Sequence, residues 1–150
     1  MRLLISSLVF SLGMMAGSEL ALADGSSAII ARQACMKVNT SAFNVMIPIF
    51  KGEKTYDDAV VQKAVHSIDF LCSDWPTFWG KDTRSFPGLN TRVEEAIWTE
   101  ADAFQKASDV YFASLKSLAA THDEAAFKVG FLALGKACSE CHDKFRGPEN

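Results

Sequence analysis

Cys138-Ser139-Glu140-Cys141-His142 is the stretch that decides how this chain folds. Two cysteines three residues apart, followed at once by a histidine, form the attachment pattern of a c-type haem. On a helix the two thiols share one face, so both can bond the vinyl groups of one porphyrin, and His142 follows as the proximal iron ligand. A redox cysteine pair normally accompanies a βαβ pattern, and a zinc site needs a second pair of ligands. The sequence shows neither, so it predicts covalent haem attachment.

The composition indicates a single exported domain. The 150 residues carry a net charge of −3 and are 49% hydrophobic, which suits one domain with a full core. Such a mildly acidic chain has no clustered basic face, so we expect no nucleic-acid partner.

Residues 1–23 have the features of a signal peptide. Arg2 precedes an apolar run, and Ala21-Leu22-Ala23 has the small-x-small form of a cleavage site. Serines and a glycine interrupt the run, which is too short for stable membrane insertion. We expect cleavage there, leaving residues 24–150 as one periplasmic domain; an uncleaved anchor is the weaker alternative.

The first half of this domain predicts two helices. Ile29, Met36, Phe43 and Phe50 recur every seven residues and predict the inward stripe of a first helix, which Pro48 kinks or ends. After a turn at residues 51–54, a second helix is capped by Thr55 or Asp57 and ends at Trp75-Pro76. Its expected inward positions are Val61, Ala64, Val65, Ile68 and Leu71. Residues 77–90 have no sustained period and are expected to be a long aromatic loop. We expect this loop to pack at the cofactor edge and in the core, and a partner-docking surface is the alternative.

The second half predicts two more helices. Thr91–Glu94 fits a capping box for the third helix, and Thr121–Glu124 fits one for the fourth, which runs to the stop signal Gly147-Pro148. His66 and His122 are interpreted as surface histidines. The third helix has two inward series, Ile97, Phe104, Tyr111 and Leu118, and Ala101, Ser108 and Leu115. The expected inward positions of the fourth helix are Phe127, Phe131 or Gly130, Leu134, Ala137 or Cys138, and Cys141.

Four amphipathic helices without a strand predict an all-α, up-down-up-down four-helix bundle. In this topology the fourth helix ends at the pole where the first begins, the second ends and the third begins. We expect the haem there, with Met46 toward the opposite pole. The residues expected at the haem pole are Arg32, Met36, Trp75, Phe78, Trp79, Thr91 and Trp98.

Over residues 26–146 the chain resembles the cytochrome c′ family, the class II c-type cytochromes. The resemblance rests on Arg32-Gln33 with Met36, Pro48, Gly52, Tyr56, Thr91-Arg92-Val93 with Ile97-Trp98, and the ending from Gly135 to Arg146. It implies thioether bonds at Cys138 and Cys141, proximal ligation by His142, and a distal residue at Met36. It also implies haem-edge or propionate contacts from Arg32, Gln33, Thr91 and Arg92. Arg146 is either a proximal arginine, as in the family, or a basic residue favoured at a helix C-terminus.

The resemblance implies two alternative functions. With an open distal side, the iron would bind small gases such as nitric oxide and carbon monoxide. With Met36 as sixth ligand, as in low-spin relatives of the c556 type, the protein would be a single-electron carrier. We expect the five-coordinate state, a homodimer and redox partner proteins. We expect no enzyme, because a haem peroxidase would want a distal acid/base residue.

Cys35 and Cys72 lie outside the family pattern. Counted from the turn near Glu53, they reach similar heights on adjacent antiparallel helices, each one position off its inward stripe. An exported compartment permits a disulfide between them. Two separate buried thiols are the alternative, and the sequence leaves both open.

Overall fold

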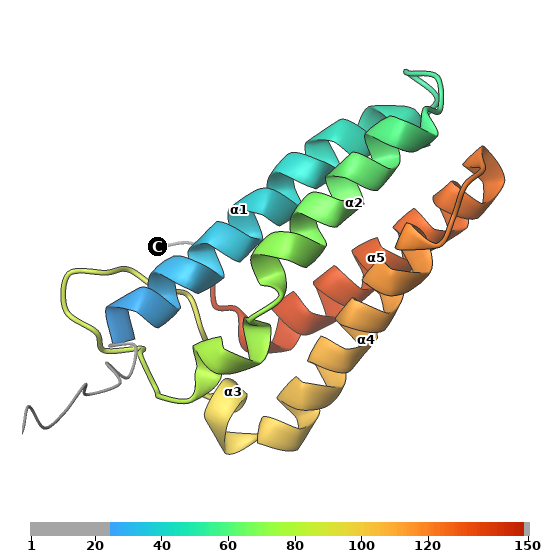
Figure 1. The fold of residues 1–150 in the computed structure, drawn as a ribbon. Coiled ribbons are helices and arrows are strands. Elements are labelled where there is room, and N and C mark those ends of the chain that lie inside the picture. The colour runs from blue at the N-terminus through green and yellow to red at the C-terminus, as the bar shows by residue number, and fades with distance from the viewer. Residues whose placement is uncertain (1–24, 149–150) are drawn as a thin grey trace, which may run out of the picture.

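The computed structural model describes residues 25–148, so the expected signal peptide lies outside the described residues. Four long helices, α1, α2, α4 and α5, make an all-α bundle, and the described part of the chain has one isolated β-bridge but no strand. The predicted bundle is confirmed (Figure 1). No helix within residues 25–148 has the length and apolarity needed to cross a membrane. The elements are α1 (Gly25–Phe50), α2 (Asp58–Cys72), the 3₁₀ helix η1 (Trp75–Trp79), α3 (Ala96–Thr99), α4 (Ala101–Ala119) and α5 (Glu124–Phe145).

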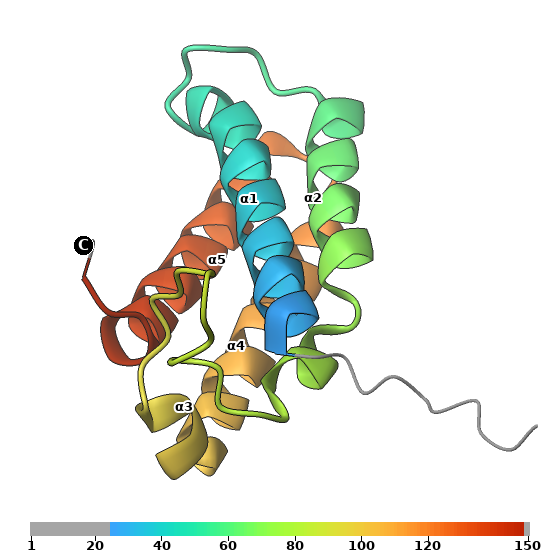
Figure 2. The ribbon, with the colours of Figure 1, turned by 90° about the vertical axis from the view of Figure 1, so that its left-hand side faces the viewer.

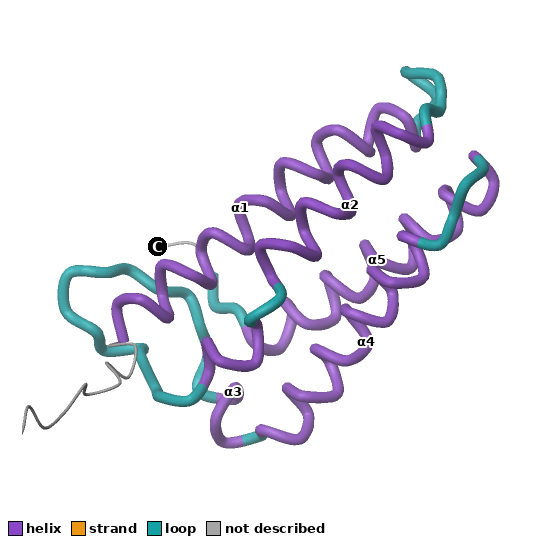
Figure 3. Tube along the Cα trace, in the orientation of Figure 1, coloured by secondary structure: helices purple, strands orange, loops and turns teal. Residues whose placement is uncertain are grey.

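The long helices form two antiparallel pairs. α1 packs mainly on α2 and α4 mainly on α5, while α1 and α5 contact each other little. The start of α1, η1, α3 and the end of α5 lie at one end of the bundle, as the predicted topology requires (Figure 2). A long loop leads from η1 to α3 at that end (Figure 3).

Helix α1 has two apolar faces, of which the periodicity predicted one. Met36 and Phe43 of the predicted stripe are half-buried and line the cavity described below. Ile29 of the same stripe is fully buried, as predicted. The other buried positions of α1 were not predicted as inward, and they are Gly25, Arg32, Cys35, Asn39, Ala42, Met46 and Ile49. Pro48 falls in the last turn of the helix, and Gly52 at φ 76 forms the turn that follows.

Helix α2 confirms the predicted cap, because the Asp57 carboxylate accepts a hydrogen bond from the backbone N–H of Val60. The first four predicted inward positions are buried, but the prediction that the fifth, Leu71, faces inward is wrong. Leu71 is half exposed and Cys72 is fully buried in its place, because Cys72 is bonded to Cys35. The helix ends there, earlier than predicted, and η1 begins at Trp75.

The disulfide between Cys35 and Cys72 is present, and both residues are fully buried. It links α1 to α2 covalently, across 37 residues of sequence. Of the two alternatives left open, the disulfide is therefore confirmed and the pair of separate thiols is wrong.

The predicted start of the third helix is wrong. The backbone N–H of Glu94 donates to the carbonyl of Phe145, and that of Gly147 donates to the carbonyl of Arg92. These hydrogen bonds pair residues 92–94 with the segment after α5, and the bridge between Val93 and Arg146 belongs to the same pairing. Thr91–Glu94 is therefore extended and forms no capping box.

A bend at Glu100 divides the expected third helix into α3 and α4. Its backbone, at φ −123 and ψ 50, lies outside the helical region. Six of the seven predicted inward positions are buried nonetheless. The exception is Ala101, the first residue of α4, which is exposed.

Helix α5 is capped by Asp123 rather than Thr121. The Asp123 carboxylate accepts a hydrogen bond from Ala126 N–H, whereas the Thr121 hydroxyl donates to the carbonyl of Leu118. The helix ends at Phe145, just before the predicted stop signal. Five of its predicted inward positions are buried, whereas Cys138 and Cys141 are half-buried; the five are Phe127, Gly130, Phe131, Leu134 and Ala137.

Candidate haem site

A cavity of about 780 Å³ lies at the pole where α5 ends. Its size is within the range of cofactor pockets, and α1, η1, the segment before α3, α4 and α5 all contribute to its lining. Phe78 and Trp98, expected at this pole, do not line it. All nine predicted site residues do: Arg32, Gln33, Met36, Thr91, Arg92, Cys138, Cys141, His142 and Arg146.

The last two turns of α5 carry the attachment motif. Cys138 and Cys141 are half-buried on the cavity side, and burial raises the pKa of the Cys138 thiol to about 11 and also raises that of Cys141. Burial, helped by the positive charges of Arg146 and Arg92, lowers the pKa of His142. The imidazole is therefore neutral at pH 7, the form in which its nitrogen can bind a metal.

Arg32 brings a buried positive charge to the cavity. The side chain is 5% exposed; Nε donates to the carbonyl of Ala28 at 3.1 Å, and one terminal nitrogen donates to the hydroxyl of Thr83. The guanidinium carbon lies 4.6 Å from the ring centre of Trp79. The other terminal nitrogen, Nη1, has no hydrogen-bond partner. A buried guanidinium with a spare donor suits a carboxylate such as a haem propionate.

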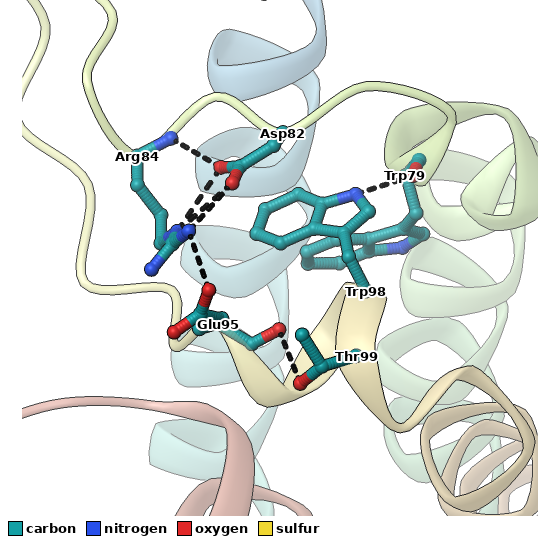
Figure 4. Close-up of polar contacts among 6 residues, drawn as sticks. All are labelled: Trp79, Asp82, Arg84, Glu95, Trp98 and Thr99. Atoms are coloured by element: carbon teal, nitrogen blue, oxygen red, sulfur yellow. Dashed lines mark hydrogen bonds and ion pairs between the residues drawn. The ribbon is translucent and has the colours of Figure 1, made fainter.

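The loop after η1 is held in place by the contacts shown in Figure 4. Arg84 donates to the carboxylates of Asp82 at 2.8 Å and Glu95 at 3.3 Å. The indole N–H of Trp98 donates to the carbonyl of Trp79 at 2.9 Å. Trp98 therefore supports a residue that lines the cavity.

Aromatic rings make much of the remaining wall. The ring centres of Trp75 and Trp79 are 4.8 Å apart, those of Trp79 and Phe104 are 4.8 Å apart, and those of Phe104 and Phe145 are 5.1 Å apart. All four residues line the cavity. Of the loop expected at residues 77–90, Trp79 and Asn90 line the cavity, whereas Phe78 and Phe86 do not.

Sequence reasoning missed Asn39 as a residue of this site. It is buried and lines the cavity; its amide donates to the carbonyl of Cys35, and its side-chain oxygen accepts a hydrogen bond from the hydroxyl of Tyr111. The sequence feature that could have indicated Asn39 is its position, one helical turn after Cys35.

These residues fit a c-type haem. Two thiols and a neutral imidazole share one side of the cavity, aromatic rings suit a flat porphyrin, and Arg32 offers an unpaired donor for a carboxylate. The family model described as cytochrome c′ matches residues 27–146. The chain belongs to the cytochrome c′ family. Such a protein carries one covalently bound c-type haem per chain.

Curated relatives and solved structures cover most of the chain. Cytochrome c-556 of Rhodopseudomonas palustris is 30% identical over 126 residues, 78% of this chain and 80% of the relative. Cytochrome c′ of Rubrivivax gelatinosus is 29% identical over 122 residues, 79% of this chain and 93% of the relative. A crystal structure of the Rubrivivax gelatinosus cytochrome c′ has a TM-score of 0.74 at 28% identity, covering 81% of this chain and 96% of its own. A nitric oxide complex of a cytochrome c′ variant from Alcaligenes xylosoxidans has a TM-score of 0.72 at 25% identity, covering 85% and 98%.

Proposed function

We propose that this chain is a periplasmic haem protein that binds small gases, above all nitric oxide, at a five-coordinate iron. The observation that supports this most is that one cavity receives Cys138, Cys141 and His142 from α5 and Met36 from α1. A relative of the same fold is known as a nitric oxide complex.

Each group in the cavity has a distinct task in this proposal. Cys138 and Cys141 anchor the haem through thioether bonds, and His142 binds the iron from the proximal side. Arg32 receives a propionate, with Gln33, Thr91 and Arg92 at the haem edge and Arg146 beyond the proximal ligand. The bound haem supplies an iron with one further coordination position. Met36 places an apolar side chain on that distal side, which disfavours water more than a small uncharged gas.

A single-electron carrier is the second candidate. Met36 lines the same cavity as His142, and a curated relative is named cytochrome c-556. Ligation by a methionine sulfur would raise the reduction potential, which suits electron transfer. The two candidates differ in whether Met36 bonds the iron.

Visible absorption spectra of ferric and ferrous protein, with and without nitric oxide, decide between them. We expect the ferrous wild-type protein to have a high-spin spectrum. The Met36→Leu variant should also be high-spin, and the addition of nitric oxide should change the spectrum. A low-spin spectrum that becomes high-spin in Met36→Leu would establish the electron carrier instead. Met46→Leu is the matched control, because Met46 is fully buried outside the cavity lining.

Mass spectrometry tests the attachment residues. Made in an export-competent host with haem-attachment machinery, the mature chain should carry the mass of one haem. Cys138→Ala and Cys141→Ala should each lower the fraction of chains that retain haem covalently, because one of the two thioether bonds is missing, while the pair Cys35→Ala and Cys72→Ala should leave that fraction unchanged. A mature chain without haem mass contradicts the proposal.

The same proposal places the protein as an exported homodimer that works with redox partner proteins and carries out no catalysis. The one histidine of the described cavity lining is His142, and His66 lies exposed on α2. Cleavage after residue 23 is checked by sequencing the N-terminus of the periplasmic protein, and the dimer by light scattering.

A further inference from the structure

At one level of the cavity wall, α1 is tied to both α2 and α4. Cys35 is bonded to Cys72 of α2. The amide nitrogen of Asn39 lies 3.7 Å from the sulfur of Cys35 and 3.6 Å from that of Cys72, and it donates to the carbonyl of Cys35 at 2.9 Å. The hydroxyl of Tyr111 on α4 donates to the side-chain oxygen of Asn39 at 2.9 Å. We call these four residues the α1 brace.

The α1 brace surrounds Met36 in sequence. Met36 follows Cys35 directly and precedes Asn39 by three residues. One residue turns a helix by about 100°, so holding Cys35 against α2 directs Met36 toward the cavity. Met36, Asn39 and Tyr111 all line that cavity.

Helix α5 constrains α1 weakly at this level, whereas α2 and η1 pack on α1. α1 and α5 contact each other little, and their ring contacts, Phe43 and Phe50 with Phe131, lie on the part of α1 that follows the brace. The separation between Met36 on α1 and His142 on α5 therefore depends on what fixes α1 to α2 and α4. A buried disulfide and a buried hydrogen bond do so, and the hydrogen-bonded residues Asn39 and Tyr111 belong to the cavity wall.

We propose that the α1 brace positions Met36 relative to the haem and so controls access to the distal side of the iron. The inference rests on the proposed haem function, but it holds whether or not Met36 bonds the iron. Cys35, Cys72, Asn39 and Tyr111 are positioning residues in this proposal, acting through Met36.

Tyr111→Phe is the sharpest variant, because it removes one hydroxyl and keeps the buried ring. Tyr56→Phe is the matched control: its hydroxyl also donates a 2.9 Å hydrogen bond, to Asp58 at the start of α2, outside the cavity lining. The measurements are the visible spectrum and the equilibrium affinity of the ferrous holoprotein for carbon monoxide, at temperatures where circular dichroism shows each variant folded. We expect Tyr111→Phe to change the affinity by about threefold or more, the lower range of coupling between contacting residues. Tyr56→Phe should leave both spectrum and affinity as in the wild type.

A double-mutant cycle shows whether the effect passes through Met36. In a Met36→Ala background, Tyr111→Phe should lose most of its effect on the affinity. The pair Cys35→Ser and Cys72→Ser should change the wild-type affinity in the same direction as Tyr111→Phe, and lose that effect in the same background.

Two results overturn the inference and leave the proposed function intact: a Tyr111→Phe holoprotein with wild-type spectrum and affinity, or an equal effect with and without Met36. The second would mean that Tyr111 acts directly on the haem. A wild-type chain without haem overturns the proposed function and the inference together.

Discussion

At the scale of single residues, Asp58 shows how one exposed carboxylate joins two distant parts of the chain. It accepts a hydrogen bond from the Tyr56 hydroxyl at 2.9 Å, and the Nδ1 of His122 lies 3.1 Å from its other oxygen. The hydrogen bond from His122, followed by that from Tyr56, lowers the pKa of Asp58 below its ordinary value. His122 is a surface residue, as predicted, yet it links the α4–α5 turn to the start of α2.

Because the pKa of the Asp58 carboxylate is lowered in the folded protein, its contribution to the free energy of unfolding decreases as the pH falls. The contribution of ionised Asp58 is present above the unfolded-state pKa of about 4 and is lost as pH falls from there through the folded-state pKa. We expect the difference in unfolding free energy between wild type and Asp58→Asn to shrink as the pH falls from about 5 toward 3. Urea unfolding across this range measures it. A difference that stays the same down to pH 3 would contradict the assignment.

At the scale of elements, Gly130 sets how closely α4 and α5 approach. A β-carbon placed there would lie 3.1 Å from Leu118 Cδ1 and 3.3 Å from Leu118 Cα. The second neighbour is backbone, so the two helices would have to separate to admit a methyl group.

Gly130→Ala should therefore lower the unfolding free energy by about 1–2 kcal/mol, because overpacking outweighs the gain in helix propensity. Gly135→Ala on the same helix is the control. Nothing lies within 4 Å of a β-carbon there, so that variant should gain roughly 0.5–1 kcal/mol. Urea unfolding of both variants tests the pair, and equal effects would show that Gly130 does not limit the helix spacing.

Periodicity predicted the elements well wherever a helix buries one face against other helices, as at Val61, Ile68 and Leu134. The predicted helix start at Thr91–Glu94 was wrong, because this segment forms hydrogen bonds with the end of α5 instead. These partners are distant in the sequence, so the local sequence pattern does not indicate them. The cysteine spacing and the family resemblance named nine residues that line one cavity, and their roles toward a haem stay predictions. Asn39 was not, because its role depends on Tyr111, 72 residues later.

At the scale of the whole molecule, the bundle is two helix pairs around a cavity at one pole. The disulfide stiffens the pair that lacks the haem attachment motif, and hydrophobic packing joins α4 to α5. In the proposed function the haem would occupy this cavity between α5 and α1, two helices that contact each other little.

The disulfide should therefore matter to global stability. Closing a loop with a sequence separation of 37 residues stabilises a folded chain by about 4 kcal/mol in the chain-entropy model. We expect the pair Cys35→Ala and Cys72→Ala to lower the unfolding free energy of the holoprotein by about that amount, measured in urea. Thiol titration of the unfolded, unreduced wild-type holoprotein should find no free cysteine, and two reactive thiols would show that the bond does not form.

The position of this disulfide also has a consequence for biosynthesis. Four cysteines allow three full pairings, and two of these would join Cys35 and Cys72 to the thiols of the attachment motif. A chain is made, and exported, from its N-terminus, so Cys35 and Cys72 emerge long before Cys138. In an exported chain, the hairpin of α1 and α2 could close its bond while α5 is still being exported. Cys138 and Cys141 would then arrive after Cys35 and Cys72 have already bonded to each other.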